Sequence, residues 1–401
     1  MLKAHDLKAL ADRLELRGDD SGAETTLVYL DRERIGLFDS WSGLIESLEP
    51  VGPPRIDPTG CQFLLAYGLV PPPYTLYENV YRLGVGDRMT VDPDGGEARF
   101  TVDYPYFDKH SRGDGGYDAG RLRRLLGAAV ARAVPAGEPA LLMQSAGKDS
   151  AGLLLGIAEA GLDNVRAVTY DPRYREQEAA PAHELARHFG VPHSVVATDP
   201  AAELDAFLRF AERSPAVCAD VALFPYLLAL EQSGVDRGVV VDGLGNDGYM
   251  GYVEPRRDAT LRAFASARRF PRIWGRLEPP DAGARLAYLW KTIQMYPAER
   301  CLAGSRLAPS TVQRLIPSET PFLRHFESVD RSWRHLSPVD FRSFVRGRIF
   351  DGAMTMPKGR LAAASMGARA VYPYCDAELI DYYFHLAPAD RYDESTRTNK
   401  T

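Results

Sequence analysis

The sequence lacks the features that mark several common classes of protein. Its 401 residues include only four cysteines, and none of them form a C-x-x-C pair, which argues against a zinc knuckle or a disulfide framework. The eight histidines form no H-E-x-x-H motif. There is no run of about 18 apolar residues that could span a membrane, and the N-terminus has no apolar core typical of a secretion signal. We therefore expect a cytoplasmic, soluble protein without a membrane partner.

An excess of positive charge is also missing. The chain has 48 lysines and arginines against 54 aspartates and glutamates, a formal net charge of -6. No global positive field exists to attract nucleic acid, so we expect no nucleic-acid partner. Hydrophobic residues make up 45% of the chain, enough for a substantial core, and the length suits two ordinary domains.

The composition changes once along the chain. Residues 1–115 alternate short β-like runs with turns and predict a small, mostly β domain. Residues 108–116 are polar and rich in glycine, as expected of a linker. The second domain is then predicted over residues 116–401.

The second domain begins with alternating strand and helix patterns. Residues 117–134 carry apolar side chains at helical spacing, and the short apolar runs farther on read as buried strands. Predicted strands lie at 139–144 and 165–171, with predicted helices at 151–161 and 178–190. Such alternation predicts an α/β fold, in which helices flank a parallel sheet. From about Glu254 onward the pattern is mainly helical.

One polar segment lies between a predicted strand and a predicted helix. It consists of Ser145, Ala146, Gly147, Lys148, Asp149 and Ser150. Small residues there expose backbone N–H groups and the next helix adds the positive end of its dipole, so the position suits a phosphate group. Lys148 can add donors, and the carboxylate of Asp149 can hold a hard cation. The alternative is a turn that uses serine and glycine for geometry alone.

A second polar segment follows the apolar run GVVV and reads DGLGNDGYMGY over residues 242–252. Its glycines permit close approach of the backbone to a ligand. Asp247 would lie at the carboxyl edge of the sheet, where open α/β folds bind ligands. Because magnesium takes only one or two protein oxygens, Asp149 and Asp247 together would suit a magnesium-nucleotide site. A hairpin or a helix cap rich in turn residues is the alternative.

Together these segments resemble the asparagine synthetases, within the N-type ATP pyrophosphatases that share the PP-loop fold. SAGKDS is similar to the family's pyrophosphate loop S-G-G-x-D-S, and DGLGNDGYMGY to its S-G-x-G-x-D-E-x-x-G-G-Y loop. The resemblance covers about residues 118–401 and the segment 67–89, and β-lactam synthetases and lasso-peptide cyclases are relatives. Further matches follow in the family's order, at Gln177-Glu178, His193, Glu212, Pro215, 372–376 (family P-F-L-D) and 399–401 (family K-x-x-L-R).

The resemblance implies an ATP-dependent ligase that adenylates a carboxylate and passes it to an amine. Asp149 and Asp247 would hold Mg²⁺ on ATP, and residues 145–150 would hold the departing pyrophosphate. Other roles fall to Val168, Thr169 and Gly243, which would contact adenosine, and to Lys400, which would stabilise negative charge during amine attack.

Several positions depart from the family pattern. Glutamine-dependent members carry a catalytic cysteine after the initiator methionine, whereas Leu2 stands here, so the resemblance implies loss of the glutaminase domain. Leu244 occupies the position of an acidic residue or a tyrosine that handles protons in relatives. Gly248, Arg369 and Val371 replace other family residues. We interpret these changes as a changed substrate, a small molecule or peptide that provides the carboxylate and amine in natural-product biosynthesis.

Two other functions remain open on the sequence. One is a PP-loop enzyme that modifies RNA, and the other is a degenerate nucleotide-binding partner subunit. The acid, the amine and the oligomeric state, with a homodimer among the options, are not given by the sequence.

Overall fold

The computed structural model describes residues 2–3, 14–50, 52–91, 98–104, 115–172, 178–235, 237–254, 256, 259–260, 286, 292, 295–302, 307–317, 322–333 and 335–399. The chain divides into two compact units. Unit 1 comprises Met1–Ser111, Asp247–Met354 and Pro388–Thr401, and unit 2 comprises Arg112–Asn246 and Thr355–Ala387. The predicted linker at 108–116 falls mostly outside the described residues, and the predicted division at residue 115 stays a prediction.

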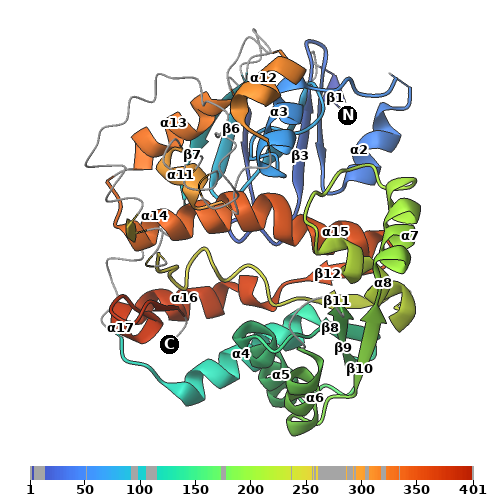
Figure 1. Cartoon of the computed structure of the whole chain (residues 1–401), viewed down its shortest axis with the longest axis vertical. Helices are drawn as coiled ribbons and strands as arrows, with labels where there is room; N and C mark the ends of the chain where they lie inside the picture. The colour runs from blue at the N-terminus through green and yellow to red at the C-terminus, as the bar shows by residue number, and fades with distance from the viewer. Residues whose placement is uncertain are drawn as a thin grey trace. The chain divides into compact units, whose positions relative to one another are not determined.

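Unit 2 is built on a five-stranded parallel sheet, drawn in the lower half of Figure 1. Its strand order is β10-β9-β8-β11-β12. The strands are β8 (Ala140–Met143), β9 (Val165–Pro172), β10 (His193–Thr198), β11 (Val239–Val241) and β12 (Arg369–Val371). All four pairings are parallel. The predicted α/β class is therefore confirmed.

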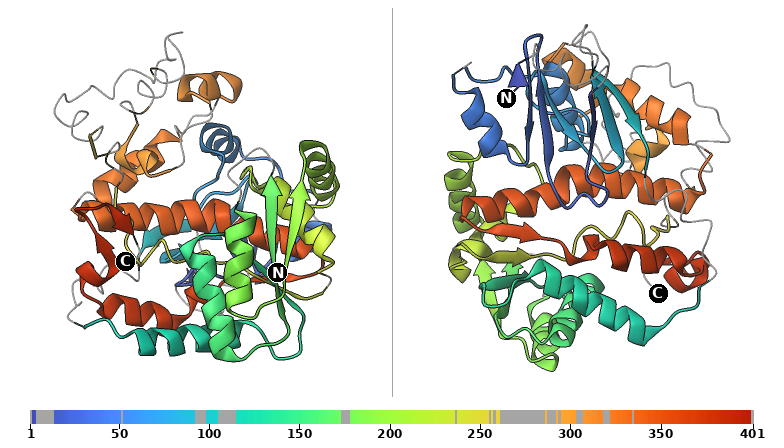
Figure 2. Two further views of the ribbon diagram at one scale, coloured as in Figure 1. Left: turned by 60° about the horizontal axis from the view of Figure 1, so that its bottom comes forward. Right: turned by 180° about the vertical axis from the view of Figure 1, so that it is seen from behind.

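Helices cover both faces of this sheet (Figure 2). They are α4 (Ala119–Ala133), α5 (Lys148–Ala160), α6 (Ala179–His188), α7 (Pro200–Ala211), α8 (Leu223–Ser233), α15 (Met356–Ser365) and α16 (Ala377–His385). Alternate sheet residues such as Leu141 and Met143 share one apolar cluster with Phe210 of α7, Leu227 of α8 and Ala362 of α15. Because side chains alternate along a strand, α5 and α6 take the opposite face.

The strand order reverses direction at β8. From β8 the chain moves outward through β9 to β10, and it later returns to place β11 on the other side of β8. The loops that follow β8 and β11 therefore leave the sheet at its topological switch point, the usual ligand position in open α/β sheets. Both polar segments singled out in the sequence begin there.

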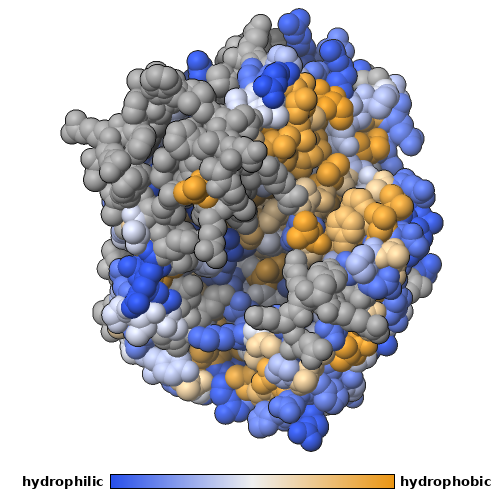
Figure 3. Space-filling model, viewed as in Figure 1, coloured by the Kyte–Doolittle hydropathy of each residue, from blue (hydrophilic) through white to orange (hydrophobic). Residues whose placement is uncertain are grey.

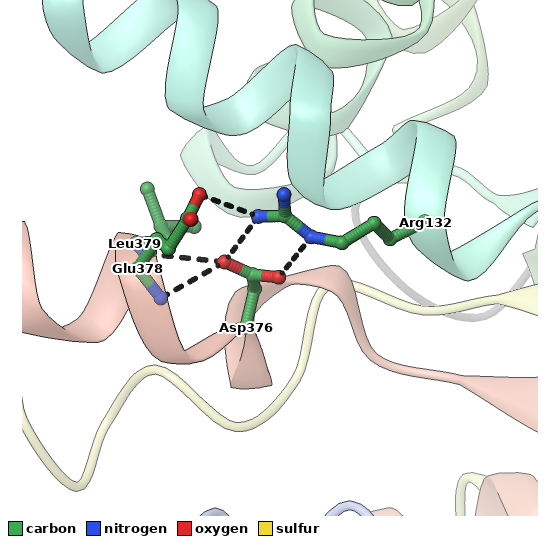
Figure 4. A network of polar contacts seen from close by, with 4 residues as sticks. All are labelled: Arg132, Asp376, Glu378 and Leu379. Carbon is green, nitrogen blue, oxygen red and sulfur yellow. Dashed lines mark hydrogen bonds and ion pairs between the residues drawn. The ribbon is translucent and has the colours of Figure 1, made fainter.

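A bidentate ion pair fixes the segment after β12 to helix α4 (Figure 4). Arg132 of α4 donates from Nε and Nη2 to the two carboxylate oxygens of Asp376, each at 2.8 Å. Asp376 also caps α16 by accepting from the backbone N–H groups of Glu378 and Leu379. This pairing holds the short 3₁₀ helix η3 (Pro373–Cys375), which contacts the loops that follow β8 and β11.

Within the described residues before 105, unit 1 contains two antiparallel sheets, of strand orders β1-β4-β3-β5 and β2-β6-β7. The strands are β1 (Leu2–Lys3), β2 (Leu14–Arg17), β3 (Thr26–Leu30), β4 (Arg34–Phe38), β5 (Val80–Leu83), β6 (Asp87–Val91) and β7 (Ala98–Val102). Their inner residues Val28, Ile35, Leu83 and Met89 form one core. This confirms the predicted mostly β N-terminal region.

The remaining elements of unit 1 are mainly helical, as predicted for the residues after Glu254, although the first two of them fall in the region predicted to be mostly β. They are α2 (Trp41–Leu48), α3 (Pro58–Tyr67), α11 (Pro297–Arg300), α12 (Pro309–Leu315), α13 (Leu323–Trp333), α14 (Pro338–Phe344), α17 (Pro388–Arg391) and the hairpin of β13 (Tyr392–Asp393) and β14 (Thr398–Asn399). A π-helix, η2, spans Val345–Thr355 and crosses the unit boundary.

No helix within the described residues is long and apolar enough to cross a membrane. Some large apolar side chains of unit 2 remain exposed, namely Val195, Leu204, Leu208, Val217 and Val221. The face seen in Figure 3 is correspondingly a mixture of hydrophilic and hydrophobic residues.

Candidate active site

The loop after β8 is closed by its own two serines. The Ser145 N–H donates to Ser150 Oγ at 3.1 Å, and Ser150 Oγ donates back to the Ser145 carbonyl at 2.9 Å. The N–H of Gly147 donates to Ser145 Oγ at 3.1 Å. The buried hydroxyl of Ser150 therefore stabilises the loop from inside. Ala146 and Lys148 are exposed.

Helix α5 begins earlier than the sequence predicts. We expected a turn through Ser150, but the helix starts at Lys148, with Gly147 as its N-cap. Gly147 has no side chain to cap the first N–H groups, and Asp149 is compatible with the first turn because its charge favours the positive end of the helix dipole. The N–H of Ala146 instead donates to the Glu178 carboxylate at 3.4 Å. A carboxylate oxygen thus contacts the loop where we predict a phosphate oxygen.

The side chain of Asp149 is held by the loop that follows β11. Asn246, which is 2% exposed, donates from Nδ2 to Asp149 Oδ1 at 2.9 Å. A Cβ on Gly243 would lie 3.3 Å from the Asp149 backbone and Cβ, so glycine permits the two loops to meet. The Tyr374 hydroxyl of η3 donates to the Asp149 carbonyl at 2.9 Å. Two loops that are distant in sequence therefore converge on Asp149.

A polar chain runs from β8 through β9 to the two histidines of this face. Thr169 Oγ1 donates to the Gln144 carbonyl at 2.9 Å and lies 2.9 Å from His193 Nε2. His193 Nδ1 lies 3.2 Å from His183 Nδ1. Burial, followed by the nearby His183, lowers the pKa of His193. No role was predicted for His183, but it contacts His193 beside Thr169, which is predicted to contact adenosine.

A cavity of about 220 Å³ opens at the switch point of the sheet. It is lined by Met143, Gln144, Ser145, Thr169, Tyr170, Glu178, Tyr226, Asp242, Leu244 and Lys358. The lining combines the end of β8, the end of β9, the loop after β11 and side chains from α8 and α15. Gln144 Oε1 is buried and has no hydrogen-bond partner among the described residues, so it can accept from a ligand that enters.

One wall of the cavity carries a cluster of charged groups. Lys358 Nζ pairs with Asp220 Oδ2 at 3.2 Å, with side chains 10% and 13% exposed. Burial alone would lower the pKa of Lys358, but Asp220 and Asp242 outweigh it and the pKa is raised. The Tyr226 hydroxyl donates to Asp242 Oδ2 at 3.1 Å. Burial is the main cause that raises the pKa of Asp242, and Lys358 opposes it.

Comparison with known proteins places the chain in a family. The model of the asparagine synthase family matches residues 121–400. The chain belongs to the asparagine synthase family. Its members are ATP-dependent ligases that form amides, generally with Mg²⁺, as the sequence resemblance implied.

Two other comparisons add little. No curated protein matches the chain. Among solved structures, the chain is similar to the U34-tRNA thiolase NcsA from Methanococcus maripaludis with its [4Fe-4S] cluster. The identity is 13% and the TM-score 0.28, over 61% of this chain and 83% of that chain.

The second predicted magnesium ligand, Asp247, lies in unit 1. Arg346 of η2 donates from Nη2 to Asp247 Oδ2 at 3.2 Å, and both side chains are about 15% exposed (16% and 15%). The guanidinium also lies over the rings of Tyr252 and Phe350, at 4.8 and 3.9 Å from their centroids. Because Asp149 belongs to unit 2, a shared metal site stays a prediction.

The donor set fits a magnesium ion that is bound mainly through phosphate oxygens. Among the described residues, no group of three or more His, Cys, Asp and Glu side chains could hold a metal by itself. Magnesium does not require such a group, since it keeps several waters and accepts one or two carboxylates plus substrate phosphates. Asp149, oriented by the Asn246 amide, has the carboxylate oxygen that such a site requires, and its role as a ligand stays a prediction.

The other predicted site residues are distributed unevenly. Ser145 and Thr169 line the cavity, Val168 is a buried core residue of β9, and Gly243 packs against Asp149. Lys400 and Gln177 lie outside the described residues. Sequence reasoning missed a set of cavity residues, Gln144, Tyr226, Asp242 and Lys358. Asp242 directly follows the predicted apolar strand and could have been noticed by that position, but nothing in the sequence marks Lys358.

Proposed function

We propose that this protein binds ATP at the switch point of the unit 2 sheet, adenylates a substrate carboxylate and joins it to an amine with release of AMP and pyrophosphate. The observation that carries the proposal is the convergence of two loops on Asp149, beside a cavity lined by Gln144, Ser145 and Thr169. Family membership supports the reaction type.

The residues have distinct tasks in this reaction. The exposed N–H groups at the start of α5 and the side chain of Lys148 would bind the pyrophosphate. Asp149 and Asp247 would hold Mg²⁺, which neutralises phosphate charge while it is bound. Thr169 and the backbone around Val168 and Gly243 would position adenosine, with ATP acting as a substrate of the reaction. Lys400 would add a positive charge near the reacting carbonyl.

The substrate is proposed to be a small molecule or peptide of natural-product biosynthesis, not aspartate. Leu244 supports this view, because it lines the cavity with an apolar side chain where asparagine synthetases have an acid. Arg369 contributes less than we expected from the sequence. It pairs with Glu138 at 3.2 Å at the exposed start of strand β12 and is not among the residues that line the cavity.

The experiment is ATP–pyrophosphate exchange with Mg²⁺ across a panel of carboxylic acids that includes aspartate. We expect exchange to depend on one class of acid and to be lost in Asp149→Asn and in Asp247→Asn. Asp163→Asn is the matched control, because Asp163 is exposed before β9, at the other edge of the sheet. Failure to bind ATP, together with no exchange for any acid, would refute the proposal. Exchange with aspartate at a good rate would refute only the substrate class.

A further inference from the structure

We propose that Asp242 is the carboxylate that binds the substrate amine and accepts its proton, with Tyr226 and the Lys358–Asp220 pair holding it in place. This assignment rests on the proposed function and adds to it the residue that activates the nucleophile. Leu244 cannot serve, since its side chain carries no acid or base.

The charges around Asp242 favour an ammonium group beside it. Three charged side chains line the cavity, Glu178, Asp242 and Lys358, and together they carry one more negative than positive charge. Lys358 makes its 3.2 Å ion pair with Asp220, so its interaction with Asp242 is shared with a second carboxylate. A buried carboxylate is stabilised by a cationic partner, and a substrate ammonium group supplies one.

The contacts of Asp242 leave room for such a partner. Its Oδ2 accepts from the Tyr226 hydroxyl at 3.1 Å, and the backbone N–H of Gly243 is a further donor to the carboxylate. A carboxylate offers about four acceptor positions. Two donors from the protein fix the orientation of the carboxylate. Its remaining acceptor positions can serve a ligand, because Asp242 lines the cavity.

The environment also suits proton transfer. Burial raises the pKa of Asp242, which makes its carboxylate a stronger base than an exposed one. The amine enters as R–NH₃⁺ and gives one proton to Asp242. The free electron pair of R–NH₂ then forms the C–N bond at the acyl carbon, and the C–O bond to the phosphate of AMP breaks. AMP leaves with the electron pair of this C–O bond. The second amine proton passes to solvent or to the AMP phosphate.

The test compares two nucleophiles in the wild type and in Asp242→Asn, using the acid that supports pyrophosphate exchange. Methylamine is an ammonium ion at neutral pH and needs deprotonation, whereas hydroxylamine is uncharged and does not. We expect Asp242→Asn to retain pyrophosphate exchange and hydroxamate formation. Its amide formation with methylamine should fall about 10²- to 10⁴-fold, the usual contribution of a general base. Its residual rate should rise with pH as free methylamine accumulates in solution.

Two further variants separate this role from a structural one. Tyr226→Phe removes one donor to Asp242 and should produce a smaller loss, again confined to methylamine. Glu231→Gln removes a negative charge from the same helix, α8, at a surface position paired with Arg209. It should leave the reaction rates with both nucleophiles unchanged. Thermal unfolding of each variant shows whether the fold is kept.

The outcomes distinguish this inference from the proposed function. If a folded Asp242→Asn loses pyrophosphate exchange, hydroxamate formation and amide formation together, Asp242 belongs to nucleotide binding. This result would overturn the inference but not the proposed function. Equal loss for both nucleophiles with exchange intact would also overturn it. Absence of exchange in the wild type would remove the proposed function and the inference with it.

Discussion

Asn246 donates its side-chain amide to the carboxylate of Asp149 at 2.9 Å, although 97 positions separate the two residues. This hydrogen bond links the loops that follow β8 and β11. Groups that orient a metal ligand commonly change metal affinity or activity by about 10- to 100-fold when they are removed.

Asn246→Ala should therefore raise the Mg²⁺ concentration needed for half-maximal pyrophosphate exchange by about 10-fold or more. Asn164→Ala is the control, because the Asn164 amide also makes hydrogen bonds, to the backbone carbonyls of Pro135 and Glu138, but lies just before β9 at the amino ends of the strands, opposite to both loops. It should reduce stability without altering the Mg²⁺ dependence. An unchanged Mg²⁺ requirement in Asn246→Ala would show that Asp149 needs no such orientation.

Two glycines with positive φ should differ in how they tolerate alanine. Gly234 has φ 59° and open space around it, whereas Gly245 has φ 98° and a Cβ there would lie 2.4 Å from Cys375 Sγ. We expect Gly234→Ala to cost about 1 kcal/mol of unfolding free energy from backbone strain alone. Gly245→Ala should cost about 2 kcal/mol or more, because overlap adds to strain. Equal losses in urea unfolding would contradict the close packing of this loop on η3.

The pair Lys358–Asp220 should show strong coupling in stability. Lys358→Met leaves the mostly buried carboxylate of Asp220 without its cation, and we expect a loss of about 3 kcal/mol. In the native protein the Ala222 N–H donates to Asp220 Oδ1 at 3.0 Å, and the side-chain oxygen of Asn in Asp220→Asn can still accept this hydrogen bond. The double variant should therefore lose less than the sum of the two, by about 1 kcal/mol or more. Strict additivity in urea unfolding would mean that the ion pair contributes nothing.

A histidine in unit 1 should make stability depend on pH. His325 is enclosed by the rings of Phe63, Tyr74 and Phe326, at 5.2–5.7 Å between centroids. Burial, with a smaller contribution from Arg348, lowers its pKa from 6.5 to about 3. The unfolded chain thus binds the extra proton first, so the stabilisation is fully present above pH 6.5 and is lost as pH falls toward 3.

The expected slope is up to about 1.4 kcal/mol of unfolding free energy per pH unit below 6.5. His325→Phe should flatten the stability profile between pH 6.5 and 4.5, since phenylalanine keeps the ring packing without the titration. The exposed His335, changed to Phe, should leave the profile as in the wild type. A profile that is equally steep in all three proteins would refute the role of His325.

The sequence predicted the parts of this structure that depend on local pattern. The apolar run before Ser145 and the one before Asp242 had to be buried strands, and small polar residues after each had to be loops. Both loops were therefore predicted at the same sheet edge. The start of α5 at Lys148 was missed because a short polar stretch reads as a turn, whereas the negative charge of Asp149 in the first turn is compatible with a helix that begins there.

The cavity wall could not be predicted in the same way. Lys358 lies in a helix otherwise rich in small residues, and its partner Asp220 lies in a loop far away in the sequence. Only the packing of α15 and α8 on one face of the sheet brings these side chains to Asp242. Such a cluster is a product of tertiary structure, and no local spacing encodes it.

Transfer of isotope from the substrate to AMP tests the central claim most directly. The acid identified by exchange is labelled with ¹⁸O in both carboxylate oxygens and incubated with ATP, Mg²⁺ and the amine. If the carboxylate attacks the α-phosphorus of ATP, one labelled oxygen should appear in the phosphate of AMP and the other should remain in the amide. Label in inorganic phosphate formed together with ADP, or unlabelled AMP beside a labelled amide, would contradict the account.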